Sequence, residues 1–358
     1  MHAKKFIKNK TIDIWKTMSV YSAFYKNHKE KYESPDFNRI SLTKDEKKEY
    51  HNYWKRISPI MSFKTVEISK SLSGKFDKRI IPEEFFPLYI EYALNSEKSV
   101  HFLANKSIYN KWFNRGFFPK DFFHKIDNIF YTYDFQRIEN IEEFIDSTIN
   151  DNDFPMVIKP NKGSHGGKDI YFVDNKEDIK RIVMQYPHLV VQEKIEQSEL
   201  INVFNEDSIN TVRVCVYRDE TSNMHVLNAS IRMGKDGSLD NMTDGGIVCS
   251  IRSDGTLNDY ANDILAKKYS SHPNSGFIFK DKHFPFYQEL IEVSKNVASE
   301  ILGARLVSLD MALDSTQQWR CIELTMGGQT IEFPQNAGEP FLGEHTDEII
   351  EKISKLAN

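Results

Sequence analysis

A lysine followed by a glycine-rich stretch is the first feature of the chain that suggests ligand binding. In VIKPNKGSHGGKDIYFV (157–173), Lys159 ends an apolar run, and Gly163, Gly166 and Gly167 follow it. A glycine-rich turn leaves backbone N–H groups free to converge on phosphate oxygens, and a lysine adds a positive charge beside them. The stretch matches neither the P-loop nor the GxGxxG pattern. A hairpin whose glycines only satisfy turn geometry is therefore an equal alternative.

A second segment, VVQEKIEQSE (190–199), begins as an apolar strand and ends in polar residues. Such a strand end can offer backbone groups to the edge of an adenine, an apolar side chain to its face and a carboxylate to ribose hydroxyls. In isolation the pattern more often marks a strand that leaves the core for a solvated turn. It gains weight because the glycine-rich loop precedes it.

Two carboxylates form the third feature. In LVSLDMALDSTQQWRCIELT (306–325), apolar residues alternate with Asp310 on one predicted strand and with Glu323 on the next. If the strands pair through a two-residue loop at 316–317, Asp310 faces Glu323 directly. Like charges opposed across a sheet are destabilising, and a divalent cation bound to phosphate oxygens would explain them. The alternatives are a longer loop that staggers the two acids, or an ion pair with Arg232 or Arg305.

Composition and charge restrict the class of protein. The chain has 358 residues, a net charge of −5 and a pI of about 6.2, which argues against a nucleic-acid partner. No stretch approaches the ~18 apolar residues of a membrane span, and the basic N-terminus lacks the apolar core of a signal peptide. We expect a cytoplasmic protein without membrane insertion. The cysteines lack disulfide or zinc-ligand spacing and fit a reducing compartment: Cys215, Cys249 and Cys321.

The secondary-structure pattern changes along the chain. Residues 1–95 read as helix and loop, with a capping box formed by Thr43 and Glu46 and with Pro82 in the first turn of a later helix. Residues 99–131 read as strand, helix and strand. From Asp153 onward, short β-branched runs bounded by turn residues indicate an antiparallel-rich α+β region.

The order and spacing of these motifs resemble the ATP-grasp superfamily. VIKP, the glycine-rich loop, VVQEKIEQSE, a later aspartate and IEL in the place of Glu-x-Asn carry the resemblance. NTVRV, SIRMGKDGSLDNMTDGGI, SHPNSG and CIEL look more closely like its sugar-transfer-associated branch, which is typical of bacterial surface-polysaccharide loci. The resemblance covers residues 100–350, and the helical N-terminal part is also similar to that branch.

The resemblance implies an α+β ATP-grasp fold, in which two α+β subdomains clasp ATP, with a helical N-terminal extension. The implied boundaries are a helical region at 1–95, an αβ subdomain at 96–150 and an ATP-grasp domain at 151–358. The last of these divides into a flap and hinge subdomain at about 151–205 and a metal-binding subdomain at about 206–358.

The family's functional residues transfer by position. Lys106 and Lys159 take the places of the two lysines that reach the α- and β-phosphates of ATP. Asp310 and Glu323 would hold Mg²⁺. The family's asparagine two residues after the glutamate is Thr325 here, so either water, Asp240, Asn241 or Asn336 would complete the site, or the metal chemistry would be altered. The flap would be Gly163, Ser164, His165, Gly166 and Gly167, the adenine hinge would be Gln192, Glu193, Lys194 and Ile195, and the ribose acid would be Glu199.

The implied reaction is an ATP- and Mg²⁺-dependent ligation of a carboxylate to an amine through an acylphosphate. Arg213 and Arg232 would contact the γ-phosphoryl group and the acylphosphate oxyanion, the alternative being a salt bridge on the strand face. The expected partners are small-molecule carboxylates and amines, with a nucleotide sugar or glycan intermediate as a further candidate and a homodimer as a candidate assembly.

Two rival functions are an ATP-grasp kinase and a non-catalytic nucleotide-binding protein of a glycan-assembly complex. Thr325 favours the non-catalytic protein, whereas the retention of both lysines and both acids favours an enzyme.

Overall fold

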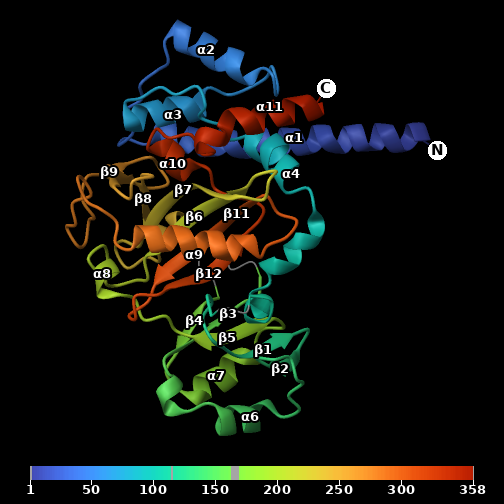
Figure 1. The fold of residues 1–358 in the computed structure, drawn as a ribbon, viewed down its shortest axis with the longest axis vertical. Coiled ribbons are helices and arrows are strands. Elements are labelled where there is room, and N and C mark those ends of the chain that lie inside the picture. The colour runs from blue at the N-terminus through green and yellow to red at the C-terminus, as the bar shows by residue number, and fades with distance from the viewer. Residues whose placement is uncertain (1, 114–115, 163–168, 358) are drawn as a thin grey trace.

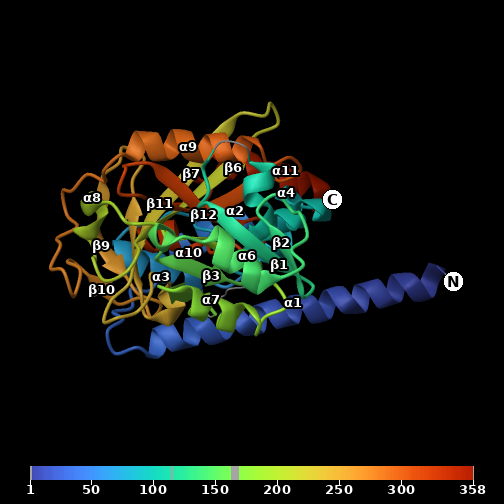
Figure 2. The same cartoon turned by 90° about the horizontal axis from the view of Figure 1, so that it is seen from below.

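The computed structural model describes residues 2–113, 116–162 and 169–357 (Figure 1). Helices gather at one end, a large sheet forms the middle and a smaller sheet forms the other end, with the long first helix projecting sideways (Figures 1 and 2). In these described ranges, no helix combines the length and the apolarity that crossing a bilayer requires.

Both sheets are antiparallel. The smaller one has the strand order β2-β1-β5-β3-β4, and the larger one has the order β10-β9-β8-β7-β6-β11-β12. The strands of the smaller sheet are β1 (Asp121–Ile126), β2 (Ile129–Thr132), β3 (Met156–Lys159), β4 (Tyr171–Val173) and β5 (Leu189–Glu193). Those of the larger sheet are β6 (Thr211–Arg218), β7 (Met224–Met233), β8 (Ile247–Ile251), β9 (Leu257–Asn262), β10 (Lys268–Tyr269), β11 (Leu306–Leu313) and β12 (Trp319–Thr325).

Two helices, α6 (Ile141–Thr148) and α7 (Lys176–Val183), complete the smaller unit. On α7 the buried residues Ile179, Ile182 and Val183 recur at helical spacing, so one stripe of the helix faces the core. Asn140 and Asn175 cap the N-termini of the two helices with their side chains. The small sheet thereby has its own hydrophobic core, which fixes the positions of β3 and β5.

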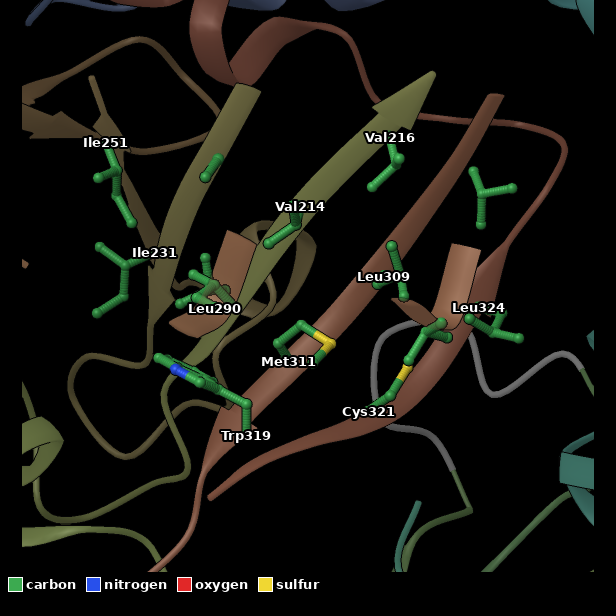
Figure 3. Packing of buried hydrophobic residues seen from close by; sticks show 14 of the residues in the cluster. Val214, Val216, Ile231, Ile251, Leu290, Leu309, Met311, Trp319, Cys321 and Leu324 are labelled. Carbon is green, nitrogen blue, oxygen red and sulfur yellow. The ribbon is translucent and has the colours of Figure 1, made fainter. Parts of the chain in front are cut away.

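The larger sheet separates apolar from polar side chains by strand alternation. Val212, Val214 and Val216 of β6 point into a core shared with β7, β11 and the helix α9 (Tyr287–Ser299) (Figure 3). Because successive side chains alternate between the faces of a strand, Arg213 and Cys215 point to the opposite face. The predicted functional residues of β6, β7, β11 and β12 therefore gather on one face of this sheet.

The helices of the N-terminal region pack with the C-terminal helices. They are α1 (His2–Glu33), α2 (Lys44–Trp54), α3 (Lys64–Ser73), the π-helix η1 (Phe86–Ile90) and α4 (Glu91–Leu94), and their partners are α10 (Glu332–Asn336) and α11 (Thr346–Ala357). The predicted capping box of Thr43 and Glu46 is confirmed at the start of α2. Buried ion pairs fasten the end of α1, with Lys31 Nζ 2.5 Å from Glu332 Oε2 and His28 Nε2 2.9 Å from Glu83 Oε2.

Two expectations differ from the structure. The predicted strand near residue 100 is wrong, because this segment forms the 3₁₀ helix η2 (Lys98–Ala104). Val100 and Leu103 are both buried, and their separation of three residues matches the repeat of a 3₁₀ helix. The boundary placed at 150/151 also falls inside one sheet, since β1 pairs with β5 across it.

The buried pair of Lys31 and Glu332 yields a stability prediction. Lys31→Ala removes a buried cation from the half-buried Glu332, whose pKa burial raises to about 7, and we expect a loss of about 1.5–3 kcal/mol in the free energy of unfolding, the contribution of a hydrogen bond to a charged group. Chemical denaturation measures this loss. The matched control is Lys29→Ala, which breaks an exposed pair with Glu33 and should cost about 1 kcal/mol or less. Equal losses in both variants would show that the Lys31 pair does not hold α1.

Candidate functional site

The two predicted acids face one another. Asp310 of β11 is the register partner of Glu323 of β12, as the sequence pattern predicts. The predicted two-residue loop is wrong, because residues 314–318 connect strands that end at Leu313 and resume at Trp319. A bulge at Ile322 shifts the register by one residue beyond that loop and restores the pairing of the acids.

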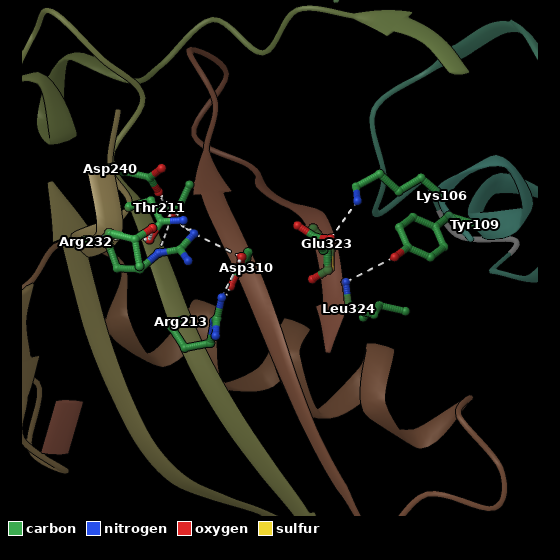
Figure 4. A network of polar contacts seen from close by, with 12 residues as sticks. Lys106, Tyr109, Thr211, Arg213, Arg232, Asp240, Asp310, Glu323 and Leu324 are labelled. Atoms are coloured by element: carbon green, nitrogen blue, oxygen red, sulfur yellow. Dashed lines mark hydrogen bonds and ion pairs between the residues drawn. The ribbon is translucent and has the colours of Figure 1, made fainter. Parts of the chain in front are cut away.

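The carboxylate of Asp310 is buried between two arginines. Arg213 donates to it through both Nε and Nη2, and Arg232 Nη2 donates to Asp310 Oδ2 over 3.0 Å (Figure 4). Burial alone would raise the pKa of Asp310, but the two guanidinium groups outweigh burial and lower the pKa below its usual value. Asp310 is therefore held ionised. The ion pair with Arg232, predicted as an alternative to a metal site, is present.

Arg232 has a second acidic partner that the sequence analysis named only as a candidate ligand. Its Nη2 lies 3.1 Å from Asp240 Oδ2, and its Nε donates to Thr211 Oγ1 over 2.9 Å. Burial would lower the pKa of Arg232, yet Asp310 and Asp240 raise it. Asp240 and Asp310 thus share one buried guanidinium.

Glu323 is held by Lys106, which lies in the short 3₁₀ helix η3 (Lys106–Ile108). Lys106 Nζ lies 2.6 Å from Glu323 Oε1, and the lysine side chain is 2% exposed. The next helix, α5 (Tyr109–Trp112), supports the strand, since the backbone N–H of Leu324 donates to Tyr109 Oη (Figure 4). Because the glutamate side chain is 35% exposed, it remains accessible from the cleft.

Lys159 is a buried cation with little compensation. It ends β3 and is 6% exposed, and its ammonium makes no hydrogen bond or ion pair in the described part of the chain. Burial, with repulsion from Lys106, lowers the pKa of Lys159 to about 8. Glu323 and Asp121 offset this only in part and form no ion pair with Lys159, so the buried ammonium suits an anionic ligand that arrives from outside.

The two lysines and Glu323 line a cleft of about 670 Å³ between the sheets. Apolar side chains provide part of its wall, as binding sites for planar rings usually require: Val157, Ile170, Phe172, Ile195 and Ile322. Acidic and polar side chains also line it, namely Glu206, Asp207 and Ser208. These three were not predicted, and only their position after the hinge strand could have indicated them.

Three of the four predicted hinge residues line this cleft, namely Glu193, Lys194 and Ile195. Gln192 is buried within β5, where its Nε2 donates to Asp121 Oδ1 over 2.6 Å. The predicted ribose acid, Glu199, opens the short helix α8 (Glu199–Asn202) and is not among the residues that line the cleft.

Two acid–base interactions around the hinge were not predicted. Arg320 Nη2 lies 2.7 Å from Glu193 Oε1, which fixes the end of β5 to β12 across the two sheets. Asp121 interacts with Lys159 only at longer range, and burial raises the pKa of Asp121 to about 6. Neither belongs to a local motif, because each partner comes from a distant part of the chain.

The remaining predicted residues are placed as follows. The flap, Gly163 to Gly167 with Ser164, His165 and Gly166, lies outside the described residues. Asn241 caps the 3₁₀ turn η6 (Met242–Asp244) with its side chain. Thr325 is the last residue of β12 and pairs with Ser308.

The donor set partly fits a magnesium ion. Asp310 and Glu323 offer two carboxylates side by side, which suits a hard cation that also binds phosphate and water. Among the described residues, no group of three or more histidine, cysteine, aspartate or glutamate side chains forms a metal site. Both carboxylates are neutralised in the structure, Glu323 by Lys106 and Asp310 by Arg213 and Arg232.

A family model described as sugar-transfer associated ATP-grasp matches residues 182–351. This match and the two-sheet α+β architecture confirm the predicted ATP-grasp fold. No curated protein matches the sequence.

Several solved structures are similar at low identity. Carboxyaminoimidazole ribonucleotide synthase of Aspergillus clavatus, in complex with ATP, is 10% identical over 64% of this chain and 46% of its own, with a TM-score of 0.40. The ATP-grasp ligase PsnB, in complex with a minimal precursor, Mg and ADP, is 14% identical over 73% and 62%, with a TM-score of 0.42. Biotin carboxylase of Campylobacter jejuni is 13% identical over 71% and 46%, with a TM-score of 0.43. The chain thus spans about half the length of two of them.

The depressed pKa of Lys159 predicts a pH dependence for nucleotide binding. Below pH 8 the free protein carries the ammonium, and above pH 8 it loses the proton, so the affinity for ATP should fall as the pH rises from 7 to 9. Calorimetry measures the affinity. Lys159→Met should weaken binding about tenfold or more and remove this dependence, because a hydrogen bond to a charged group contributes ~1.5–3 kcal/mol. The control is Lys280→Met, an exposed lysine. Unchanged affinity in Lys159→Met would remove this residue from the site.

The acid pair predicts a magnesium dependence. Glu323→Gln keeps the shape of the side chain but removes its charge, so the gain in ATP affinity on adding Mg²⁺ should largely disappear. The melting temperature should fall less than in Asp310→Asn, because Glu323 is 35% exposed and pairs with one cation, Lys106, rather than two. Asp310→Asn should lose the same gain and also lose stability, because two buried guanidinium groups lose their anion. Calorimetry with and without chelator, and thermal denaturation, measure both. The control is Glu292→Gln on the exposed face of α9. A full magnesium response in Glu323→Gln would contradict the metal role.

Proposed function

We propose that this chain, whose residues 182–351 match a family model described as sugar-transfer associated ATP-grasp, uses ATP to join a carboxylate to an amine. The observation that carries the proposal is the arrangement of opposite charges around one cleft. Lys106, Lys159 and Glu323 line it, and Asp310, flanked by Arg213 and Arg232, is the cross-strand neighbour of Glu323. This charge pattern, together with the match to the family model, supports ATP-dependent ligation.

The chemistry proceeds in two balanced steps. A carboxylate oxygen attacks the γ-phosphorus of ATP, and the bond to the β-phosphate oxygen breaks to give an acylphosphate and ADP. The amine nitrogen then attacks the acyl carbon, the bond to phosphate breaks, and an amide, inorganic phosphate and a proton are released. Such a reaction requires positioning and charge neutralisation rather than a protein nucleophile. The cysteines fit this requirement, since all three are buried.

Each charged residue has a task in this scheme. Lys106 and Lys159 would bind the α- and β-phosphates, and Arg213 and Arg232 would neutralise the transferred phosphoryl group and the acylphosphate oxygens. Asp310 and Glu323 would hold magnesium, which when bound supplies positive charge to the phosphate oxygens. Glu193, Lys194 and Ile195 would border the adenine. Glu206 and Asp207 replace Glu199 as candidates for the ribose, because they line the cleft.

As the acceptor we propose a sugar acid or an amino acid used in surface-polysaccharide synthesis, and the family description, sugar-transfer associated ATP-grasp, supports a link to sugar chemistry. The test is a screen of ADP release with carboxylates in the presence of hydroxylamine, which traps an acylphosphate as a hydroxamate, followed by mass spectrometry with natural amines. Hydroxamate formed in proportion to ADP supports the ligase. A phosphorylated acceptor that accumulates without reacting with hydroxylamine supports a kinase, and neither product with any carboxylate contradicts the proposal.

Thr325 gives a prediction about the strength of the metal site. An asparagine carbonyl is a better oxygen ligand for magnesium than a threonine hydroxyl. Thr325→Asn should therefore lower the magnesium concentration that gives half-maximal ADP release several-fold, with little change in the affinity for ATP alone. Thr325→Val, which removes the hydroxyl and keeps the shape, is the matched control. If Thr325→Asn instead raises the acceptor KM and leaves the magnesium dependence unchanged, Thr325 faces the acceptor.

A further inference from the structure

A single row of polar side chains crosses five strands of the large sheet. Successive strand pairs bring together Glu323 with Asp310, Asp310 with Arg213, Arg213 with Ser230, and Ser230 with Ser250. Neighbouring strands lie ~4.8 Å apart, so the two serines begin about 10 Å from Asp310 along the row. The charges end at Arg213, and the row continues as neutral hydroxyls.

The two serines are buried and have no hydrogen-bond partner. Ser230 is 1% exposed and Ser250 is 4% exposed, and neither hydroxyl bonds to another group in the part of the chain that the structure describes. Buried polar groups are normally satisfied, so each such exception requires an explanation. Because the two unpaired hydroxyls are neighbours on one face of the sheet, we expect a single explanation for both.

A third group with the same property lies over these strands. Asn336, at the end of α10, is 4% exposed, and its Nδ2 also has no partner among the described residues. The helix packs against β7 and β8, which carry Ser230 and Ser250. The backbone carbonyl of Asn336 accepts a hydrogen bond from Tyr260 Oη over 2.7 Å, which holds this end of the helix over the sheet.

The chemistry of these three groups defines the ligand. Each hydroxyl can donate and accept, the amide nitrogen can donate, and none of the three carries charge. A ligand whose carboxylate lies at Arg213 would therefore extend into a zone that recognises neutral hydroxyl groups. We propose that Ser230, Ser250 and Asn336 form the acceptor subsite, and that the acceptor is a polyhydroxylated carboxylate such as a hexuronate. This inference rests on the proposed ligase function.

The subsite is closed in this structure. Met242, Val248 and Phe333 form a small apolar cluster, and Val248 lies on β8 two residues before Ser250, on the same face. Met242 comes from η6 and Phe333 comes from α10. The acceptor reaches the hydroxyls when these two elements separate, which breaks this small contact together with contacts that hold α10, among them Tyr260 Oη to the Asn336 carbonyl and Lys31 Nζ to Glu332 Oε2.

The test compares two carboxylates of similar size, glucuronate and cyclohexanecarboxylate, by hydroxamate formation with ATP, Mg²⁺ and hydroxylamine. The wild type should favour glucuronate. Ser230→Ala and Ser250→Ala, made singly and together, should reduce the ratio of kcat/KM for glucuronate to that for cyclohexanecarboxylate at least tenfold, mainly through the KM for glucuronate. The affinity for ATP and the melting temperature should be retained, because each substitution removes an unpaired hydroxyl.

The matched control is Ser294→Ala. Ser294 lies on α9, is 0% exposed and has a hydroxyl that is unpaired among the described residues, but it belongs to the helix that covers the opposite face of the sheet. In Ser294→Ala, the ratio of kcat/KM for glucuronate to that for cyclohexanecarboxylate should equal the wild-type ratio. A wild type that converts cyclohexanecarboxylate as well as glucuronate, or serine variants with an unchanged ratio, would overturn the subsite and leave the ligase function standing. A wild type that makes hydroxamate from no carboxylate would overturn both.

Discussion

The carboxylate of Asp310, buried between Arg213 and Arg232, is the interaction on which the arrangement of this molecule depends. A charge in the interior is tolerated only when opposite charges and hydrogen bonds surround it. The three residues come from β11, β6 and β7, so strand order and register must both be right for the cluster to form. The apolar residues that alternate with them form the core against α9, so the fold and the charged face are built by the same strands.

The charges of the cleft are largely paired with one another in the structure. Glu323 is held by Lys106, and Asp310 and Asp240 share Arg232, whereas Lys159 is compensated only at longer range. Binding a polyphosphate with a cation would therefore be an exchange of partners, in which anions move to the arginines and lysines while the acids turn to the metal. Such an exchange keeps every buried charge compensated at the start and at the end. It also ties binding to pH through Lys159, whose ammonium has little compensation.

The pairing of Asp310 with Glu323 was predicted correctly, but the loop on which that prediction rested was wrong. Sequence reasoning predicted a two-residue loop, whereas the structure has a longer loop and a bulge at Ile322 whose effects on the register cancel. Alternation of apolar residues determined which face Asp310 and Glu323 occupy, and this part was predictable because it is local. The segment around Val100 was read as a strand, since a short apolar run does not separate a strand from a helical turn.

Contacts that join distant parts of the chain were beyond such reasoning. The pairs Arg320–Glu193 and Gln192–Asp121 depend on how the two sheets and their strands meet, and no local pattern records that. The same holds for the row from Glu323 to Ser250, in which each step is short across the sheet but long along the chain. Cross-strand neighbours of a recognised residue are therefore the natural place to look for further site residues.

The most direct measurement of the central claim is the fate of a carboxylate oxygen. A carboxylate labelled with ¹⁸O is incubated with the protein, ATP, Mg²⁺ and an amine, and the released phosphate is analysed by mass spectrometry. Ligation through an acylphosphate transfers one labelled oxygen to inorganic phosphate for each amide formed, and this is the predicted result. Amide formation with unlabelled phosphate, or with the label in AMP, would contradict the account.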